Sequence, residues 1–99
     1  MQAVHVSGRF VNELKEPIEG SIFFEPSKLM IIQEEVAYAT LAPTVTLDDG
    51  HFVVHLTRTD QATVPWHYKV HCPIGTWSIK VDGDGPLLLR DLLPQRFRA

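Results

Sequence analysis

The sequence predicts an all-β fold in which two antiparallel sheets pack against each other. Short runs of alternating apolar and polar residues recur along the 99-residue chain, and turns containing Gly or Pro separate them. Alternation with a period of two places one set of side chains on a buried sheet face and the other set outside. Strands at this short, regular spacing are typical of a β-sandwich or barrel, and we expect about seven of them in an Ig-like or transthyretin-like sandwich.

The clearest strand signal is the segment Thr44–Leu56. Its alternation places five apolar side chains on one face: Val45, Leu47, Phe52, Val54 and Leu56. Between the two runs lies Asp48-Asp49-Gly50, and Asp-Gly is a favoured hairpin loop because both residues tolerate a positive φ. Either a two-residue type I′ loop or a three-residue loop with Gly50 in the left-handed region fits. We therefore predict a β-hairpin here.

Further strands are predicted on both sides of this hairpin, at Val4–Phe10, Ser21–Glu25, Trp66–Cys72, Thr76–Asp82 and Pro86–Leu89. Gly8 lies inside the first of them and indicates a bulge or a close backbone approach. Burial of the inward aromatic side chains would contribute on the order of 2–3 kcal/mol each. These side chains are Phe10, Phe24, Phe52, Trp66, Tyr68 and Trp77.

The segment Ser27–Pro43 is compatible with two structures. The spacing of Leu29, Ile32 and Val36 fits one face of a short helix. A short strand followed by an irregular crossover fits equally well. Because the surrounding elements are all strands, we expect strand and loop.

Composition limits the class of protein. The length predicts a single domain over residues 1–94, followed by a C-terminal tail at 95–99. A net charge of -3 gives no global attraction to nucleic acid or to an anionic membrane. Cys72 is the single cysteine, so no internal disulfide is possible. No apolar run approaches transmembrane length, and the N-terminus has no signal-peptide hydrophobic region.

The five histidines raise the possibility of a metal site. His51 and His55 share a strand face, as do His67 and His71, but residues four apart on a strand are about 13 Å apart. A site would need convergence across strands, such as His55 opposite His67 or His71, together with a third ligand. Asp82-Gly83-Asp84-Gly85 is a fragment of a calcium loop without the length or terminal Glu of an EF-hand. We expect solvent-facing histidines, a plain turn and no metal.

No motif in the chain predicts catalysis. Cys72 ends an apolar strand face and is expected to be a buried, inert thiol. Glu34 and Glu35 are adjacent, so their carboxylates would point apart, and we expect a solvated acidic turn. The chain has no Gly-rich phosphate loop and no nucleophile elbow. We therefore expect no enzyme, no catalytic residues and no cofactor.

The C-terminal residues are the candidate partner-binding site. Phe97, flanked by Arg96 and Arg98, combines an aromatic anchor with two charges that can pair with carboxylates. Leu92 and Leu93 lie just before this tail. We expect these residues to contact another copy of the chain or another protein, and a frayed, solvated end is the alternative that fits the same residues.

Most of the chain, residues 4–94, resembles the small β-sandwich modules of minor tail and tail-fibre proteins of actinobacterial phages. The resemblance rests on the order of Val6–Val11, Pro17–Pro26, Ala42–Asp48, Gly50–Val54, Asp60, Trp66–Val70 and Asp91–Pro94. Two features depart from the pattern. The first turn is Glu13-Leu14-Lys15-Glu16 without Asp-Gly, and the chain stops at Ala99 where such modules usually begin a longer fibre.

The resemblance implies a structural role with no catalytic residues. It implies a virion protein assembled in the host cytoplasm, an adaptor or decoration of the tail. Its partners would be other tail proteins or copies of itself in an oligomeric particle. The alternative is a binding module for carbohydrate or a host cell surface. The inward parity of Trp66, Tyr68 and Trp77 disfavours that alternative, and Phe23 is the aromatic residue whose parity points outward.

Overall fold

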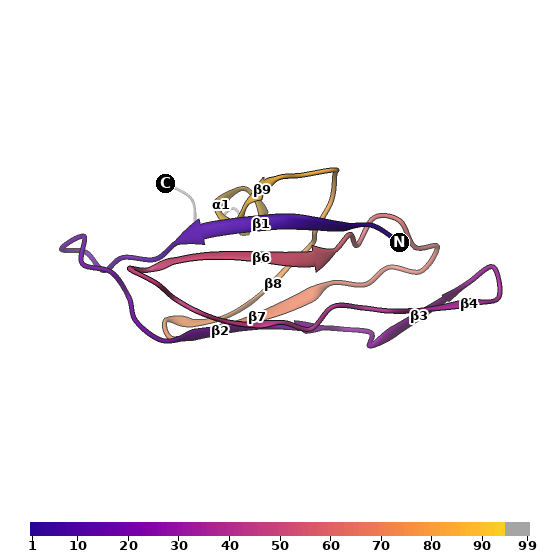
Figure 1. Ribbon diagram of the computed structural model, residues 1–99, viewed down its shortest axis with the longest axis horizontal. Helices are drawn as coiled ribbons and strands as arrows, with labels where there is room; N and C mark the ends of the chain where they lie inside the picture. The colour runs from indigo at the N-terminus through magenta and orange to yellow at the C-terminus, as the bar shows by residue number, and fades with distance from the viewer. Residues whose placement is uncertain (95–99) are drawn as a thin grey trace.

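The computed structural model describes residues 1–94 and confirms the all-β prediction (Figure 1). One sheet has the strand order β6-β1-β9, made of β1 (Ala3–Arg9), β6 (His51–Thr57) and β9 (Leu87–Leu88). A second sheet has the order β5-β2-β7-β8, made of β2 (Ser21–Pro26), β5 (Thr44–Thr46), β7 (Tyr68–Cys72) and β8 (Gly75–Ile79). A separate two-stranded sheet contains β3 (Met30–Gln33) and β4 (Val36–Ala39), and the helical turn α1 (Leu89–Leu92) follows β9.

The core lies between the two larger sheets and follows the predicted parity. Phe24 and Tyr68 are fully buried, and Phe52 of the opposite sheet packs against Phe24 with the ring centroids 5.8 Å apart. The predicted inward aromatics are all buried: Phe10, Phe24, Phe52, Trp66, Tyr68 and Trp77. The alternating pattern therefore identified the buried set, because each strand has one side facing the other sheet.

The predicted hairpin at Thr44–Leu56 is wrong as a strand pairing but right as a turn. Asp49 and Gly50 have φ of 53° and 77°, as a two-residue type I′ loop requires, and Asp48 and His51 form an isolated bridge. Beyond that bridge the chains separate. β5 pairs with β2, whereas all seven residues of β6 pair with β1. Pairing with β1 supplies a seven-residue ladder, which three-residue β5 is too short to offer.

Several strand ends differ from the prediction. Trp66 and Val81 are buried as expected, but each lies outside the strand to which it was assigned. The last strand is two residues long and runs parallel to β1, so one pairing of the sandwich departs from the antiparallel pattern. The chain then turns into α1, which was not predicted. Within residues 1–94, no helix is long and apolar enough to cross a membrane.

Gly8 marks a close approach and no bulge. The register between β1 and β6 is continuous, with Gly8 opposite Phe52. A Cβ at this position would lie 2.8 Å from the Phe52 ring and 3.2 Å from the Leu89 Cβ. Glycine therefore lets α1 and the Phe52 ring pack directly over β1.

The Tyr68 hydroxyl on β7 links the two larger sheets through two hydrogen bonds. It donates to the carbonyl of Leu41 at 2.7 Å and accepts the backbone N–H of Thr57 at 3.1 Å. Burial raises the pKa of this hydroxyl. The two bonds satisfy groups on β6 and on the segment that leads into β5.

Candidate protein-interaction surfaces

Strands β3 and β4 form a hairpin, called the arm here (residues 30–39), that projects from one end of the sandwich (Figure 1). The expected strand is present in place of a helix, but the expected irregular crossover is wrong, because a second strand, β4, follows and pairs with β3. Ile31 faces inward, is 1% exposed and belongs to the core. Its cross-strand partner Tyr38 shares that inner face and is half-buried.

Hydrogen bonds fix the arm to the body. Gln33 Nε2 donates to the carbonyl of Gln61 at 3.3 Å, and Gln33 Oε1 accepts the N–H of Thr63 at 3.0 Å. At the base, Thr40 Oγ1 donates to the carbonyl of Lys28 at 2.6 Å. The arm is thus held at its base and along its inner face, which gives its outer face a defined direction.

The outer face of the arm is apolar. It consists of two cross-strand pairs, Met30 with Ala39 and Ile32 with Ala37. Met30 is 53% and Ile32 is 68% exposed, and both alanines are exposed. Within residues 1–94 the outer edges of these two strands pair with no other strand. An exposed apolar face with open edges is a template for association, so the arm is the strongest candidate for a partner contact.

The tip of the arm is a strained acidic turn. Glu34 and Glu35 have φ of 53° and 67°, which is the type I′ geometry. Residues other than Gly, Asn and Asp adopt it infrequently, so local propensity disfavours a hairpin at this position. Both residues are exposed, which confirms the predicted solvated acidic turn and places two negative charges at the tip.

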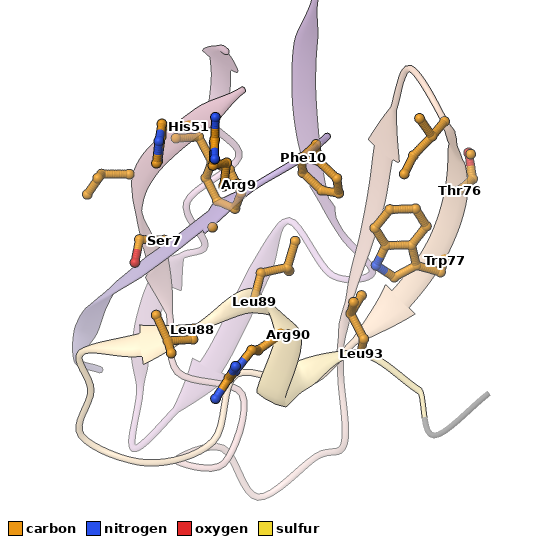
Figure 2. A pocket seen from close by; sticks show the side chains of 15 residues that line it. Ser7, Arg9, Phe10, His51, Thr76, Trp77, Leu88, Leu89, Arg90 and Leu93 are labelled. Atoms are coloured by element: carbon orange, nitrogen blue, oxygen red, sulfur yellow. The ribbon is translucent and has the colours of Figure 1, made fainter. Parts of the chain in front are cut away.

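A groove of about 860 Å³ lies between the three-stranded sheet, α1 and the turn from β7 to β8. The rings of Phe10 and Trp77 line one side of it, and Leu89 and Leu93 of the C-terminal segment face them (Figure 2). Phe10 and Trp77 pack with ring centroids 6.3 Å apart. Sequence reasoning missed this groove because its walls come from segments far apart in the chain.

The rim of the groove combines apolar and basic side chains. Val53, Ile74 and Leu88 are 60%, 58% and 46% exposed. Arg9 and Arg90 lie on opposite sides of Leu89 in Figure 2. Among residues 1–94, Arg9 forms an exposed ion pair of 3.8 Å with Asp49, whose backbone carbonyl also accepts a hydrogen bond from Arg9 Nε at 3.4 Å, and Arg90 forms an exposed ion pair of 3.7 Å with Asp91. A guanidinium has five N–H donors, so both retain donors for a partner carboxylate.

The histidines do not show the convergence across strands that a metal site would need. His55 lies opposite His5, with ring centroids 4.1 Å apart, and not opposite His67 or His71. On the other sheet, His71 Nε2 is 3.0 Å from Glu25 Oε1 and its ring stacks on Phe23. Within residues 1–94, no three His, Cys, Asp or Glu side chains group closely enough to hold a metal ion.

Carboxylates of the Asp82–Gly85 turn bond to the loop that follows β6. Asp84 pairs with Arg58, which also holds Asp60 by two contacts of 2.9 and 2.8 Å. Asp82 accepts the Thr59 hydroxyl at 2.9 Å. The bonds from Arg58 and from the Gly83 N–H lower the pKa of Asp60 to about 2. The Arg58 guanidinium therefore binds a carboxylate of this turn, whereas in a calcium loop the carboxylates would bind a metal ion.

The structure describes some of the remaining predicted site residues and not others. Leu92 and Leu93 are half-buried and pack against the core. Arg96, Phe97 and Arg98 lie outside the described residues, so their partner contact stays a prediction. Cys72 was expected to be buried but is partly exposed, and its Sγ donates to the Gly75 carbonyl at 3.3 Å. It ends β7 at the β7–β8 turn, where the sheet no longer covers it.

The chain matches none of the models of known protein families and none of the curated proteins with which it was compared. The fold and the two surfaces described above are thus the observations on which a function can be argued.

Proposed function

We propose that the protein is a structural assembly component of a phage virion, a tail-associated adaptor or decoration protein, that works through protein–protein contacts. The observation that carries this proposal is the apolar outer face of the arm. Met30 and Ile32 expose large side chains on the outer face of a hairpin whose inner face is fixed to the body by hydrogen bonds from Gln33. A lone protein domain gains nothing from that exposure, whereas a partner would bury it.

The viral part of the proposal rests on the order of sequence segments that resemble phage tail modules. The partners would be other tail proteins or further copies of this chain, in the virion. The all-β sandwich agrees with such a module, although a fold by itself does not define a function.

The test is incorporation into particles. Ile32→Asp places a charge on the apolar face of the arm without touching the core. We expect the variant protein to melt within about 2 °C of the parent, because surface substitutions change the free energy of unfolding by about 0.5 kcal/mol or less. Its incorporation into purified particles should fall at least tenfold. Leu14→Asp, at a 74% exposed position in the β1–β2 turn, is the matched control and should be incorporated normally.

Recognition of carbohydrate or a host surface is the second candidate, and one observation favours it. Phe23 is 36% exposed on the outer face of β2, where Thr44 and His71 lie directly opposite it on the neighbouring strands. An exposed ring among polar side chains can stack on a sugar. Phe23→Ala should then abolish binding to a glycan array or to host cells. No binding by the parent protein would exclude this candidate.

A further inference from the structure

We propose that the arm of one molecule docks in the groove of a second copy, so that the chain assembles head to tail. This inference rests on the proposed assembly function and names the partner and both contact surfaces. The occupant of the groove is the outer face and tip of the arm, residues 30–39.

The two surfaces are complementary in chemistry. The arm offers Met30 and Ile32 on its outer face and the carboxylates of Glu34 and Glu35 at its tip. The groove offers exposed apolar side chains on its rim and the guanidinium groups of Arg9 and Arg90. Apolar surface meets apolar surface, and two negative charges meet two arginines that retain free donors. Such complementarity fixes the register of an interface.

The outer face of the other sheet is a poorer match. Its outward positions are mostly polar, including Glu25, Thr44, Thr46, Lys69 and Ser78. An apolar hairpin would bury little apolar surface of its partner there. The apolar and basic character of the groove therefore selects it as the receiving surface.

The positions of the two surfaces decide the symmetry. The described fold is 50 Å long and 25 × 21 Å across. The arm lies at one end of the long axis, whereas the end of β1 and the β7–β8 turn, which border the groove, lie toward the other (Figure 1). A molecule cannot reach its own groove with its own arm across that length. Contacts between different surfaces are heterologous, and they produce rings or open filaments.

The experiment is a mixing test in sedimentation velocity. Ile32→Asp blocks the arm and leaves the groove intact, and Leu88→Asp blocks the groove rim and leaves the arm intact. Leu88 is 46% exposed, so both variants should fold. We expect the parent to form dimers and larger species as its concentration rises, and each variant alone to remain monomeric. An equal mixture should regain dimers and stop there, because one intact arm and one intact groove remain per pair.

The mixture distinguishes this geometry from its rivals. If the arms pair with each other symmetrically, the Leu88→Asp variant dimerises on its own, and mixing it with Ile32→Asp does not increase the amount of dimer. If residues 95–99 of the same chain fill the groove, the parent is monomeric and the chain ending at Pro94 associates. Either result overturns the proposal, as does a parent that stays monomeric at every concentration. Leu14→Asp should associate like the parent.

A charge variant sharpens the assignment. Glu35→Lys should weaken parent-like association severalfold, and Arg90→Glu in the partner should restore it when the two variants are mixed. If Glu35→Lys associates like the parent, the arm tip does not meet the basic rim and the register proposed here is wrong. One pair of results would remove this inference and leave the proposed function standing: the protein does not self-associate, but its incorporation into particles still depends on Ile32.

Discussion

The arm and the body of the sandwich use the same alternating pattern to opposite effect. In the body, β2 buries Ile22 and Phe24 and exposes Ser21, Phe23 and Glu25 on its other face. In the arm, β3 buries Ile31 and exposes Met30 and Ile32. The body thus directs most of its apolar side chains to its own core. The arm has more apolar surface than its own fold can cover, and that excess indicates a surface kept for another molecule.

The largest effect on stability should come from the body. Phe24→Ala removes a fully buried ring that packs on Phe52 and leaves a cavity between the sheets. We expect the free energy of unfolding to fall by about 3–5 kcal/mol. Chemical denaturation followed by tryptophan fluorescence measures it. A midpoint equal to that of the parent would contradict the sheet packing described here.

A second substitution asks whether the arm is part of the same cooperative unit. Ile31 is buried on the inner face of the arm, so Ile31→Ala should cost about 2–4 kcal/mol. Hydrogen exchange of the arm amides should increase along with this loss. If only the arm amides exchange faster while the global midpoint is unchanged, the arm folds independently of the body.

Loss of the Tyr68 hydroxyl, which links the two larger sheets, should reduce the free energy of unfolding by an intermediate amount. Tyr68→Phe deletes the hydroxyl that bonds to Leu41 and Thr57, and it leaves the buried N–H of Thr57 without this acceptor. We expect a loss of about 1–3 kcal/mol in thermal or denaturant unfolding. Retention of full stability would show that the two groups find other partners.

The Arg58 cluster adds a smaller, pH-dependent contribution. Because the pKa of Asp60 is lowered from 3.8 to about 2 in the folded state, the charged carboxylate stabilises the fold. This contribution is fully present above about pH 4 and is lost as the pH falls through 2. Partial exposure screens it to about 1 kcal/mol. The difference in stability between the parent and Asp60→Asn should therefore shrink as the pH falls and vanish below about pH 2. A difference that persists there would come from the shape of the side chain and not from its charge.

The smallest effect on stability should come from the outer face of the arm. Ile32→Ala removes exposed apolar surface, so unfolding should change by less than about 0.5 kcal/mol. Self-association measured by sedimentation should nevertheless weaken at least severalfold. The contrast with Ile31→Ala, one residue away, is the sharpest form of the comparison between arm and body. If the two variants lost stability and self-association to the same extent, Ile31 and Ile32 would not lie on surfaces with different roles.

The alternation of residues determined most of the strands outside residues 27–43 and most of the buried side chains. It placed Phe24, Tyr68 and Trp77 in the core correctly, and Asp48-Asp49-Gly50 predicted a tight turn of one of two types, of which the structure has type I′. These features are local, because a period of two fixes the face of a side chain and the turn fixes two φ angles. No longer-range information is needed for either.

Strand neighbours were decided only in three dimensions. The period of two does not say which strand lies alongside, so β5 and β6 were paired with each other although each belongs to a different sheet. The parallel pairing of β9 with β1, the β3–β4 hairpin through Glu34 and Glu35, and the groove beside Trp77 were likewise not predictable. Each depends on contacts between distant segments, where the length of available ladder and the burial of the core outweigh local propensity.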